Sequence, residues 1–125
     1  GSGDILLVAT GRDARRAELG PWHPFQVGMA GLHPDCISWL RERDVSVLGC
    51  DGVSDVLPGN HPDDWVMPIH QTVIVAMGVH LLDNLRLDRL ASACQMHSKW
   101  SFLFTVAPLR VEGGTGSPAN PIALL

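Results

Sequence analysis

The sequence has little charge and no surplus of basic residues. Only 18% of its 125 residues are charged, below the share of about 25% that is usual in soluble domains. Nine basic residues stand against thirteen acidic ones, which leaves a net charge of −4. A protein that neutralises nucleic-acid phosphates needs a basic surface. The charge balance therefore argues against a nucleic-acid partner.

Long apolar runs and paired cysteines are also missing. The longest purely apolar runs, residues 5–9 and 73–77, are far shorter than the roughly 20 residues that cross a bilayer, and no secretory signal precedes them. The sequence has three cysteines, Cys36, Cys50 and Cys94, at wide spacings and without a Cys-x-x-Cys motif. Neither a disulfide framework nor a thiolate zinc site is indicated. We expect a cytoplasmic protein with no membrane partner.

What the sequence does contain is enough apolar material for one core. Apolar residues make up 46% of the chain. A domain of this length buries roughly two-thirds of its unfolded surface, whereas a second independent core is not expected. We therefore predict a single domain over residues 1–125.

Short apolar runs alternate with helical patterns along the chain. Four runs predict strands, of which the first two are continuous enough to be buried on both faces: residues 5–9, 45–48, 101–107 and 122–125. Three segments have apolar residues at helical spacing: residues 34–43, 70–77 and 87–94. Gly78 is expected to end the second helix. The alternation predicts an α/β fold with a mixed sheet and two to three helices.

Two segments rich in proline and glycine predict ordered loops. In residues 20–31, we expect the rings of Trp22 and Phe25 to pack inward. Residues 49–70 leave the carboxyl end of a predicted buried strand, where open α/β sheets place their ligand sites. Loops of that length in a compact domain are usually functional or flexible. This second loop is therefore the place to search for a site.

His70 and Asp83 are the first candidate pair. They are thirteen positions apart, with the expected helix end at Gly78 between them, and that break can bring the two side chains together. An imidazole and a carboxylate in one pocket serve general acid–base chemistry or orient a metal-bound water. Spacing alone favours a structural interpretation, a hydrogen-bonded core histidine and a helix-capping aspartate. We name His70 and Asp83 as candidate catalytic residues.

Asp51 and Asp55, at the mouth of the second predicted strand, are candidate substrate-binding carboxylates. The competing interpretation is that both form turns. Among the other histidines, His23, His33 and His61 each precede a proline, which indicates loop architecture. No His-x-x-x-His pair occurs, so a metal site would have to assemble from distant loops. No Gly-x-Ser-x-Gly motif supports a serine hydrolase either.

An ordered series of short sequence blocks spans nearly the whole chain. In chain order the blocks are Gly28-Met29-Ala30-Gly31-Leu32-His33-Pro34-Asp35-Cys36, Trp39-Leu40, Gly49-Cys50-Asp51-Gly52, Pro68-Ile69-His70, Gly78, Leu82-Asp83-Asn84-Leu85, Thr105-Val106-Ala107-Pro108-Leu109, Gly113-Gly114-Thr115-Gly116-Ser117-Pro118 and Asn120-Pro121-Ile122. Their succession is more specific than any single block. It resembles the second half of the cyclase family, metal-dependent hydrolases that include kynurenine formamidase (arylformamidase) and isatin hydrolase.

The resemblance implies a β/α/β-type fold and a hydrolase that opens an amide or lactam bond with a divalent zinc or manganese ion. The family's histidine near the start of this helix corresponds to His70, and its glutamate in a Glu-Asn-Leu block corresponds to Asp83, a shorter carboxylate. The family's metal motif, His-x-Gly-Thr-His-x-Asp, does not occur here. Since catalytic metal sites use about three protein ligands, we expect this carboxy-terminal half neither to bind the metal by itself nor to be active alone.

Two functions from different classes follow. In the first, the chain is part of a metal-dependent hydrolase of a small-molecule substrate and acts when the missing amino-terminal half is supplied. In the second, it is a non-catalytic, self-associating binding or structural module derived from a truncated cyclase. In both cases uncovered apolar faces and strand edges lead us to expect a homo-oligomer, a dimer or higher.

Overall fold

The computed structural model describes residues 1–59 and 65–125. The chain forms two compact units, Gly1–Asp88 and Arg89–Leu125. The single domain expected over residues 1–125 stays a prediction.

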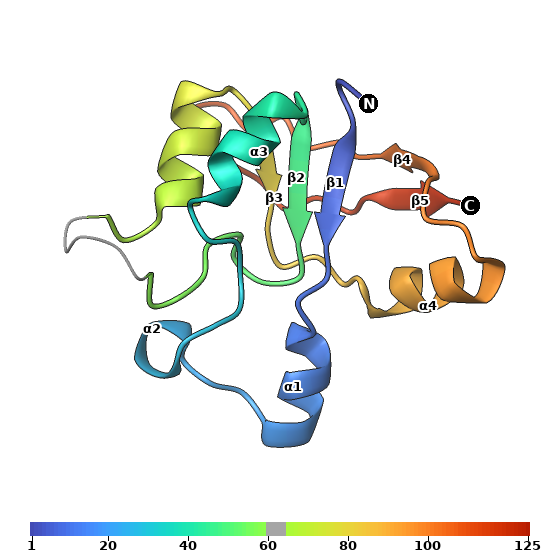
Figure 1. Ribbon diagram of the computed structural model, residues 1–125, viewed down its shortest axis with the longest axis horizontal. Coiled ribbons are helices and arrows are strands. Elements are labelled where there is room, and N and C mark those ends of the chain that lie inside the picture. The colour runs from blue at the N-terminus through green and yellow to red at the C-terminus, as the bar shows by residue number, and fades with distance from the viewer. Residues whose placement is uncertain (60–64) are drawn as a thin grey trace. The chain divides into compact units, whose positions relative to one another are not determined.

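A three-stranded parallel sheet forms the centre of the first unit (Figure 1). Its strands are β1 (Ile5–Val8), β2 (Val47–Cys50) and β3 (His80–Leu82), and β2 lies in the middle. Leu48 of β2 pairs with Leu6 on one side and Leu81 on the other, and its side chain is fully buried. The first two strands confirm the predictions from apolar runs. The third strand, which is only three residues long, was not anticipated.

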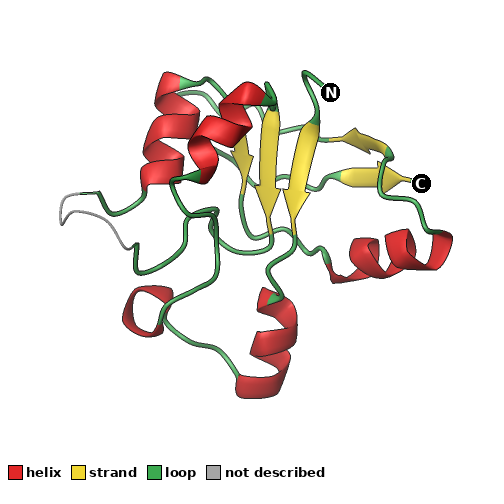
Figure 2. Cartoon of the chain, viewed as in Figure 1, coloured by secondary structure: helices red, strands yellow, loops and turns green. Residues whose placement is uncertain are grey.

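Two helices supply the rest of this unit's core. They are α3 (Cys36–Glu42) and η1 (His70–Ala76), and Figure 2 shows them beside the sheet. Buried apolar side chains from these helices, from the strands and from the segments next to them form one cluster: Leu40, Val45, Leu48, Ile69, Val73 and Val79. Burying this surface is what ties the helices to the sheet.

The helix η1 is a π-helix rather than the predicted α-helix. Its wider turn is closed by the Met77 N–H, which donates to the carbonyl of Thr72, five residues earlier. Apolar residues spaced at i, i+3 and i+4 therefore do not share one face, because a turn of the π-helix contains more residues than a turn of the α-helix. Val73 is accordingly buried while Ile74 is 46% exposed. The predicted helix end is confirmed, since Gly78 follows with a φ of +68°, which favours glycine.

Two short helices, α1 (Arg12–Leu19) and α2 (Pro24–Val27), lie beyond the carboxyl ends of β1 and β2 in Figure 1. They were not predicted, because helices of eight and four residues are too short for a helical period to be recognised. The expectation that the rings of residues 20–31 pack inward is wrong for Phe25, which is 59% exposed. It holds better for Trp22, which is half-buried and donates its indole N–H to the carbonyl of Gly28 at 2.9 Å.

The second unit contains α4 (Asp88–His97), which begins where the first unit ends, and the antiparallel pair β4 (Leu103–Thr105) and β5 (Ile122–Leu124). These elements agree with the predicted helix and the two predicted late strands. The α/β fold class is therefore confirmed. The described residues hold five helices, where two to three were expected, and the parallel and antiparallel strands form two separate sheets. Within the same described ranges, no helix is long and apolar enough to cross a membrane.

Candidate functional site

The loop that leaves the carboxyl end of β2 carries three buried polar residues: Asp51, Ser54 and Asp55. This is the long loop that the sequence singled out. Its residues 60–64, His61 among them, lie outside the described part of the chain. Buried polar groups are costly unless they are hydrogen-bonded, so the partners of these three side chains show what the loop builds.

Asp55 holds the start of η1. Its Oδ1 accepts a hydrogen bond from the backbone N–H of Ile69 at 2.7 Å, and its Oδ2 accepts one from the N–H of His70 at 3.3 Å. A carboxylate in this position satisfies helix N–H groups that have no partner within the helix. Asp55 Oδ2 also lies 2.6 Å from Nδ1 of the His70 ring. One buried carboxylate therefore fixes both the backbone and the imidazole of His70.

Asp83 meets the other side of the same ring. It directly follows β3, and its Oδ2 lies 2.8 Å from Nε2 of His70. Its other oxygen, Oδ1, accepts hydrogen bonds from the backbone N–H of Ser54 at 3.0 Å and from the Ser54 hydroxyl at 2.7 Å. Asp55, His70 and Asp83 thus form a continuous chain of carboxylate, imidazole and carboxylate, which we call the Asp–His–Asp chain.

The Asp–His–Asp chain opens to solvent at one end. The Asp55 side chain is 0% exposed, whereas those of His70 and Asp83 are 24% and 22% exposed. The Asp83 end of the Asp–His–Asp chain is therefore partly accessible to solvent, while the Asp55 end is closed. This polarity matches the division of labour in acid–base pairs, where a buried carboxylate orients the ring and the outer nitrogen exchanges protons.

A close backbone approach positions the loop that carries Asp55. The N–H of Leu32 donates to the carbonyl of Ser54 at 2.8 Å, and the N–H of Val56 donates to the carbonyl of Leu32 at 3.2 Å. A Cβ at Gly31 would lie 2.2 Å from the backbone oxygen of Asp55. Only glycine fits there, which gives a physical reason for a glycine in the Gly28–Gly31 block of the sequence.

The two carboxylates favour a protonated His70. The hydrogen bonds to Asp55 and then to Asp83 raise the pKa of His70 from 6.5 to about 9, against the opposing effect of burial. Burial raises the pKa of Asp83, but the hydrogen bonds from His70 and Ser54 outweigh it and hold that pKa below its usual range. At neutral pH the Asp–His–Asp chain is therefore an imidazolium between two carboxylates.

Asp51 serves a different helix. Its oxygens accept hydrogen bonds from the backbone N–H groups of Thr10, Gly11 and Arg12 and from the Thr10 hydroxyl, at 2.6 to 3.1 Å. The carboxylate thus caps α1 from a distant point in the sequence. Burial raises its pKa, yet the hydrogen bonds from Thr10 and the neighbouring N–H groups lower it overall.

The structure brings together three of the four candidate residues. The sequence paired His70 with Asp83, and the two side chains do meet. Asp55, a candidate substrate-binding residue, holds the far side of the His70 ring. Among the described residues, the partners of the Asp51 carboxylate lie at the start of α1 and not in the Asp–His–Asp chain. Ser54, which holds Asp83, was missed, because one serine in a loop carries no signal in the sequence.

The described residues do not fit a catalytic metal ion. Within residues 1–59 and 65–125, no group of three or more His, Cys, Asp or Glu side chains is arranged to hold one. Each ring nitrogen of His70 already faces a carboxylate oxygen, and a protonated imidazole has no lone pair for a metal. The divalent ion that the resemblance implies would need ligands beyond the residues that the structure describes.

Two comparisons with known proteins bear on identity. Residues 1–55 match the family model of the putative cyclases. The fold also matches a crystal structure described as that of a novel cyclase, with a TM-score of 0.83 and 26% sequence identity, over 99% of this chain and 40% of that chain. Among curated proteins no match is found. The chain thus resembles the cyclases in both sequence and fold, and it spans 40% of the length of the matched cyclase.

Proposed function

We propose that this chain is part of a cyclase-type hydrolase that opens amide or lactam bonds, and that the Asp–His–Asp chain handles a proton in that reaction. The observation that carries the proposal is the placement of His70 between Asp55 and Asp83, at 2.6 and 2.8 Å, in a chain that resembles the cyclases. That the chain corresponds to the carboxy-terminal half of such an enzyme is part of the same proposal.

The raised pKa of His70 favours the role of a proton donor. Hydrolysis of an amide adds water to the carbonyl carbon and breaks the C–N bond, and the departing nitrogen must take up a proton. His70 holds its proton at neutral pH, because its pKa is about 9. Its Nε2 lies at the more exposed end of the Asp–His–Asp chain. In the proposed role Nε2 delivers the proton to the leaving nitrogen, Asp55 keeps Nδ1 in place, and Asp83 steadies the ring until substrate arrives.

The proposal also includes a divalent zinc or manganese ion, which would be held mainly by residues that the structure does not describe. Such an ion would supply Lewis-acid chemistry to the hydrolysis. With at most a small share of the ligands, the chain alone is proposed to be inactive.

The test measures hydrolysis of N-formylkynurenine and of isatin in the presence of Mn²⁺ or Zn²⁺. The chain is assayed alone and mixed with a separately expressed amino-terminal part of the similar cyclase. We expect turnover only in the mixture, and its loss in the variant His70→Gln. The variant His97→Gln, which changes an exposed histidine of α4, serves as the matched control and should keep full activity.

Turnover by the 125-residue chain alone would contradict the proposed incompleteness. No turnover in the mixture, after a binding measurement has shown that the two parts associate, would contradict the hydrolase. Equal losses in His70→Gln and His97→Gln would remove the Asp–His–Asp chain from the mechanism.

The second candidate function is a self-associating binding or structural module without catalysis. Exposed apolar side chains on η1 favour self-association, since Val75 is 82% exposed next to Ile74. Strands β1 and β3 also form the edges of the three-stranded sheet. We accordingly propose a homo-oligomer, and a well-folded monomer at micromolar concentration in sedimentation would refute it.

A cytoplasmic location is proposed on the basis of three free cysteines.

A further inference from the structure

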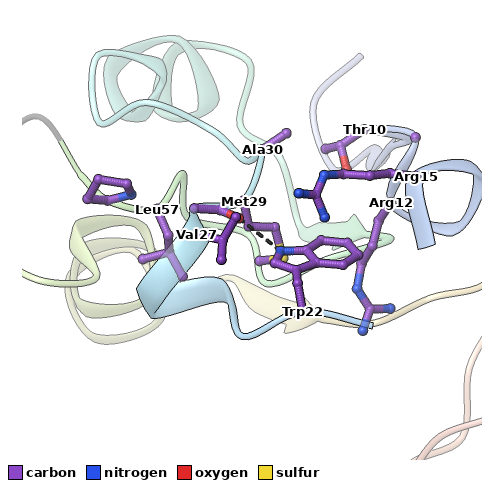
Figure 3. A pocket seen from close by; sticks show the side chains of 11 residues that line it. Thr10, Arg12, Arg15, Trp22, Val27, Met29, Ala30 and Leu57 are labelled. Carbon is purple, nitrogen blue, oxygen red and sulfur yellow. Dashed lines mark hydrogen bonds between the residues drawn. The ribbon is translucent and has the colours of Figure 1, made fainter. Parts of the chain in front are cut away.

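A pocket separate from the Asp–His–Asp chain lies in the first unit, between the start of α1 and the segment around α2. Its volume is about 410 Å³, within the range of small-molecule sites. Arg12 and Arg15 of α1 line it together with Trp22. Figure 3 shows these three side chains grouped at one end of the pocket, with Val27 and Leu57 toward the other end.

Arg15 has a buried nitrogen without a partner. Its Nη1 is shielded from solvent and, within the described residues, has no hydrogen-bond acceptor. A buried donor on a charged group that stays unsatisfied is costly. Because Arg15 also lines the pocket, an anion bound there would offset the charge of its guanidinium group.

Trp22 holds the guanidinium in position. The Cζ atom of Arg15 lies 3.9 Å from the centroid of the Trp22 ring, close enough for a cation–π interaction. The indole is itself anchored, because its N–H donates to the carbonyl of Gly28. A stacked guanidinium loses little freedom on binding, and its planar fork matches the two oxygens of a carboxylate.

The other residues that line the pocket indicate which chemical class of ligand it can bind. Among the described residues that line the pocket, none is acidic, although the whole chain carries a net charge of −4. Beyond the arginines the wall is mostly apolar and includes Val27, Met29 and Leu57. The N–H groups at the start of α1 already donate to Asp51. The pocket therefore offers guanidinium groups and an apolar surface, but not the ring of backbone donors that phosphate sites use.

We propose that this pocket binds a small organic carboxylate, with the carboxylate on Arg15 and the apolar body against Val27, Met29 and Leu57. Binding of the carboxylate at this pocket requires only the 125-residue chain. It does not depend on the proposed hydrolase activity, and either proposal can fail without the other.

The test compares two probes with the same apolar body, the anion phenylacetate and the neutral amide phenylacetamide, by calorimetric titration into the 125-residue chain. We expect saturable binding of phenylacetate and at least tenfold weaker binding of phenylacetamide. This comparison needs no variant and so does not depend on whether a variant folds. Inorganic phosphate is the third probe, and it should bind more weakly than phenylacetate because it has no apolar body.

Two variants locate the binding. Arg15→Met should weaken phenylacetate binding at least tenfold and leave phenylacetamide unchanged. Arg16→Met removes the same charge from an exposed neighbour on α1 and should change neither. The proposal is overturned by equal affinity for the two organic probes, by phosphate binding more tightly than phenylacetate, by no saturable binding of phenylacetate, or by equal losses in the two variants.

Discussion

Replacing Asp83 by asparagine should lower the pKa of His70 and destabilise the protein over a defined pH range. The variant keeps the size of the side chain but removes the charge that lies 2.8 Å from Nε2. The rise of the His70 pKa from 6.5 to about 9 corresponds to roughly 3 kcal/mol of preference for the protonated ring, at about 1.4 kcal/mol per pKa unit. Asp55 is the first cause of that rise and Asp83 the second. We therefore expect Asp83→Asn to lower the pKa by about one unit and to cost on the order of 1 kcal/mol.

The pH range follows from the sign of the shift. Because the folded-state pKa lies above 6.5, the bound proton stabilises the fold fully below pH 6.5, and this contribution is lost as the pH rises to about 9. The pKa of Asp83 is lowered, so its contribution needs a pH above the ordinary aspartate pKa of 3.8 and is lost as the pH falls. The difference between the wild-type protein and Asp83→Asn should thus be largest between about pH 5 and 6.5 and shrink as the pH rises to about 9, where only the contribution of the Ser54 hydrogen bonds to Asp83 is left.

The assay is an NMR titration of the histidine Cε1–H signals, with the His70 signal assigned through His70→Gln. Urea unfolding at pH 6 and pH 9.5 gives the matching free energies. Glu42→Gln removes a charge from the exposed end of α3 and should leave the His70 pKa unchanged. A wild-type His70 that titrates near 6.5, or a pKa that Asp83→Asn does not lower, would refute this reasoning.

Three further variants test how the site is built, each by urea unfolding. Gly31→Ala should cost 2 kcal/mol or more, on the order of a severe overpacking change, because the added Cβ would meet the Asp55 backbone at 2.2 Å. Gly116→Ala, whose Cβ would meet nothing within 4 Å, should cost little. Asp51→Ala should lower the free energy of unfolding by about 2 kcal/mol, as for a strong helix cap. Because the pKa of Asp51 is lowered, this loss of stability should shrink as the pH falls below about 4. Equal stability of the variant and the wild-type protein at pH 7 would contradict the capping role. Ser54→Ala should cost about 1 kcal/mol through the lost hydrogen bond to Asp83, and it should raise the pKa of Asp83. Unchanged stability together with an unchanged Asp83 titration would count against that contact.

Much of the sheet and one half of the site were predictable from the sequence. Buried parallel strands are continuous apolar runs, and this signal located β1 and β2. The pair His70 and Asp83 could be anticipated because a glycine between them must end the intervening helix. Gly78, with its positive φ, does so.

The missed features depend on contacts between distant segments. Asp51 caps α1 from about forty residues away, and Asp55 caps η1 from the loop after β2. No local pattern encodes such caps. The helix α1 is eight residues long and none of them is buried, and β3 is only three residues long. The π-helical turn of η1 changes the period on which a prediction of its buried face depends.

The most direct measurement of the proposed proton transfer is the pH dependence of hydrolysis in the reconstituted mixture of the two parts. If His70 donates the proton, activity falls as the pH rises through about 9, and Asp83→Asn moves that fall to lower pH. Activity that instead increases with pH through 9, or a profile that Asp83→Asn leaves in place, would contradict the role assigned to the Asp–His–Asp chain.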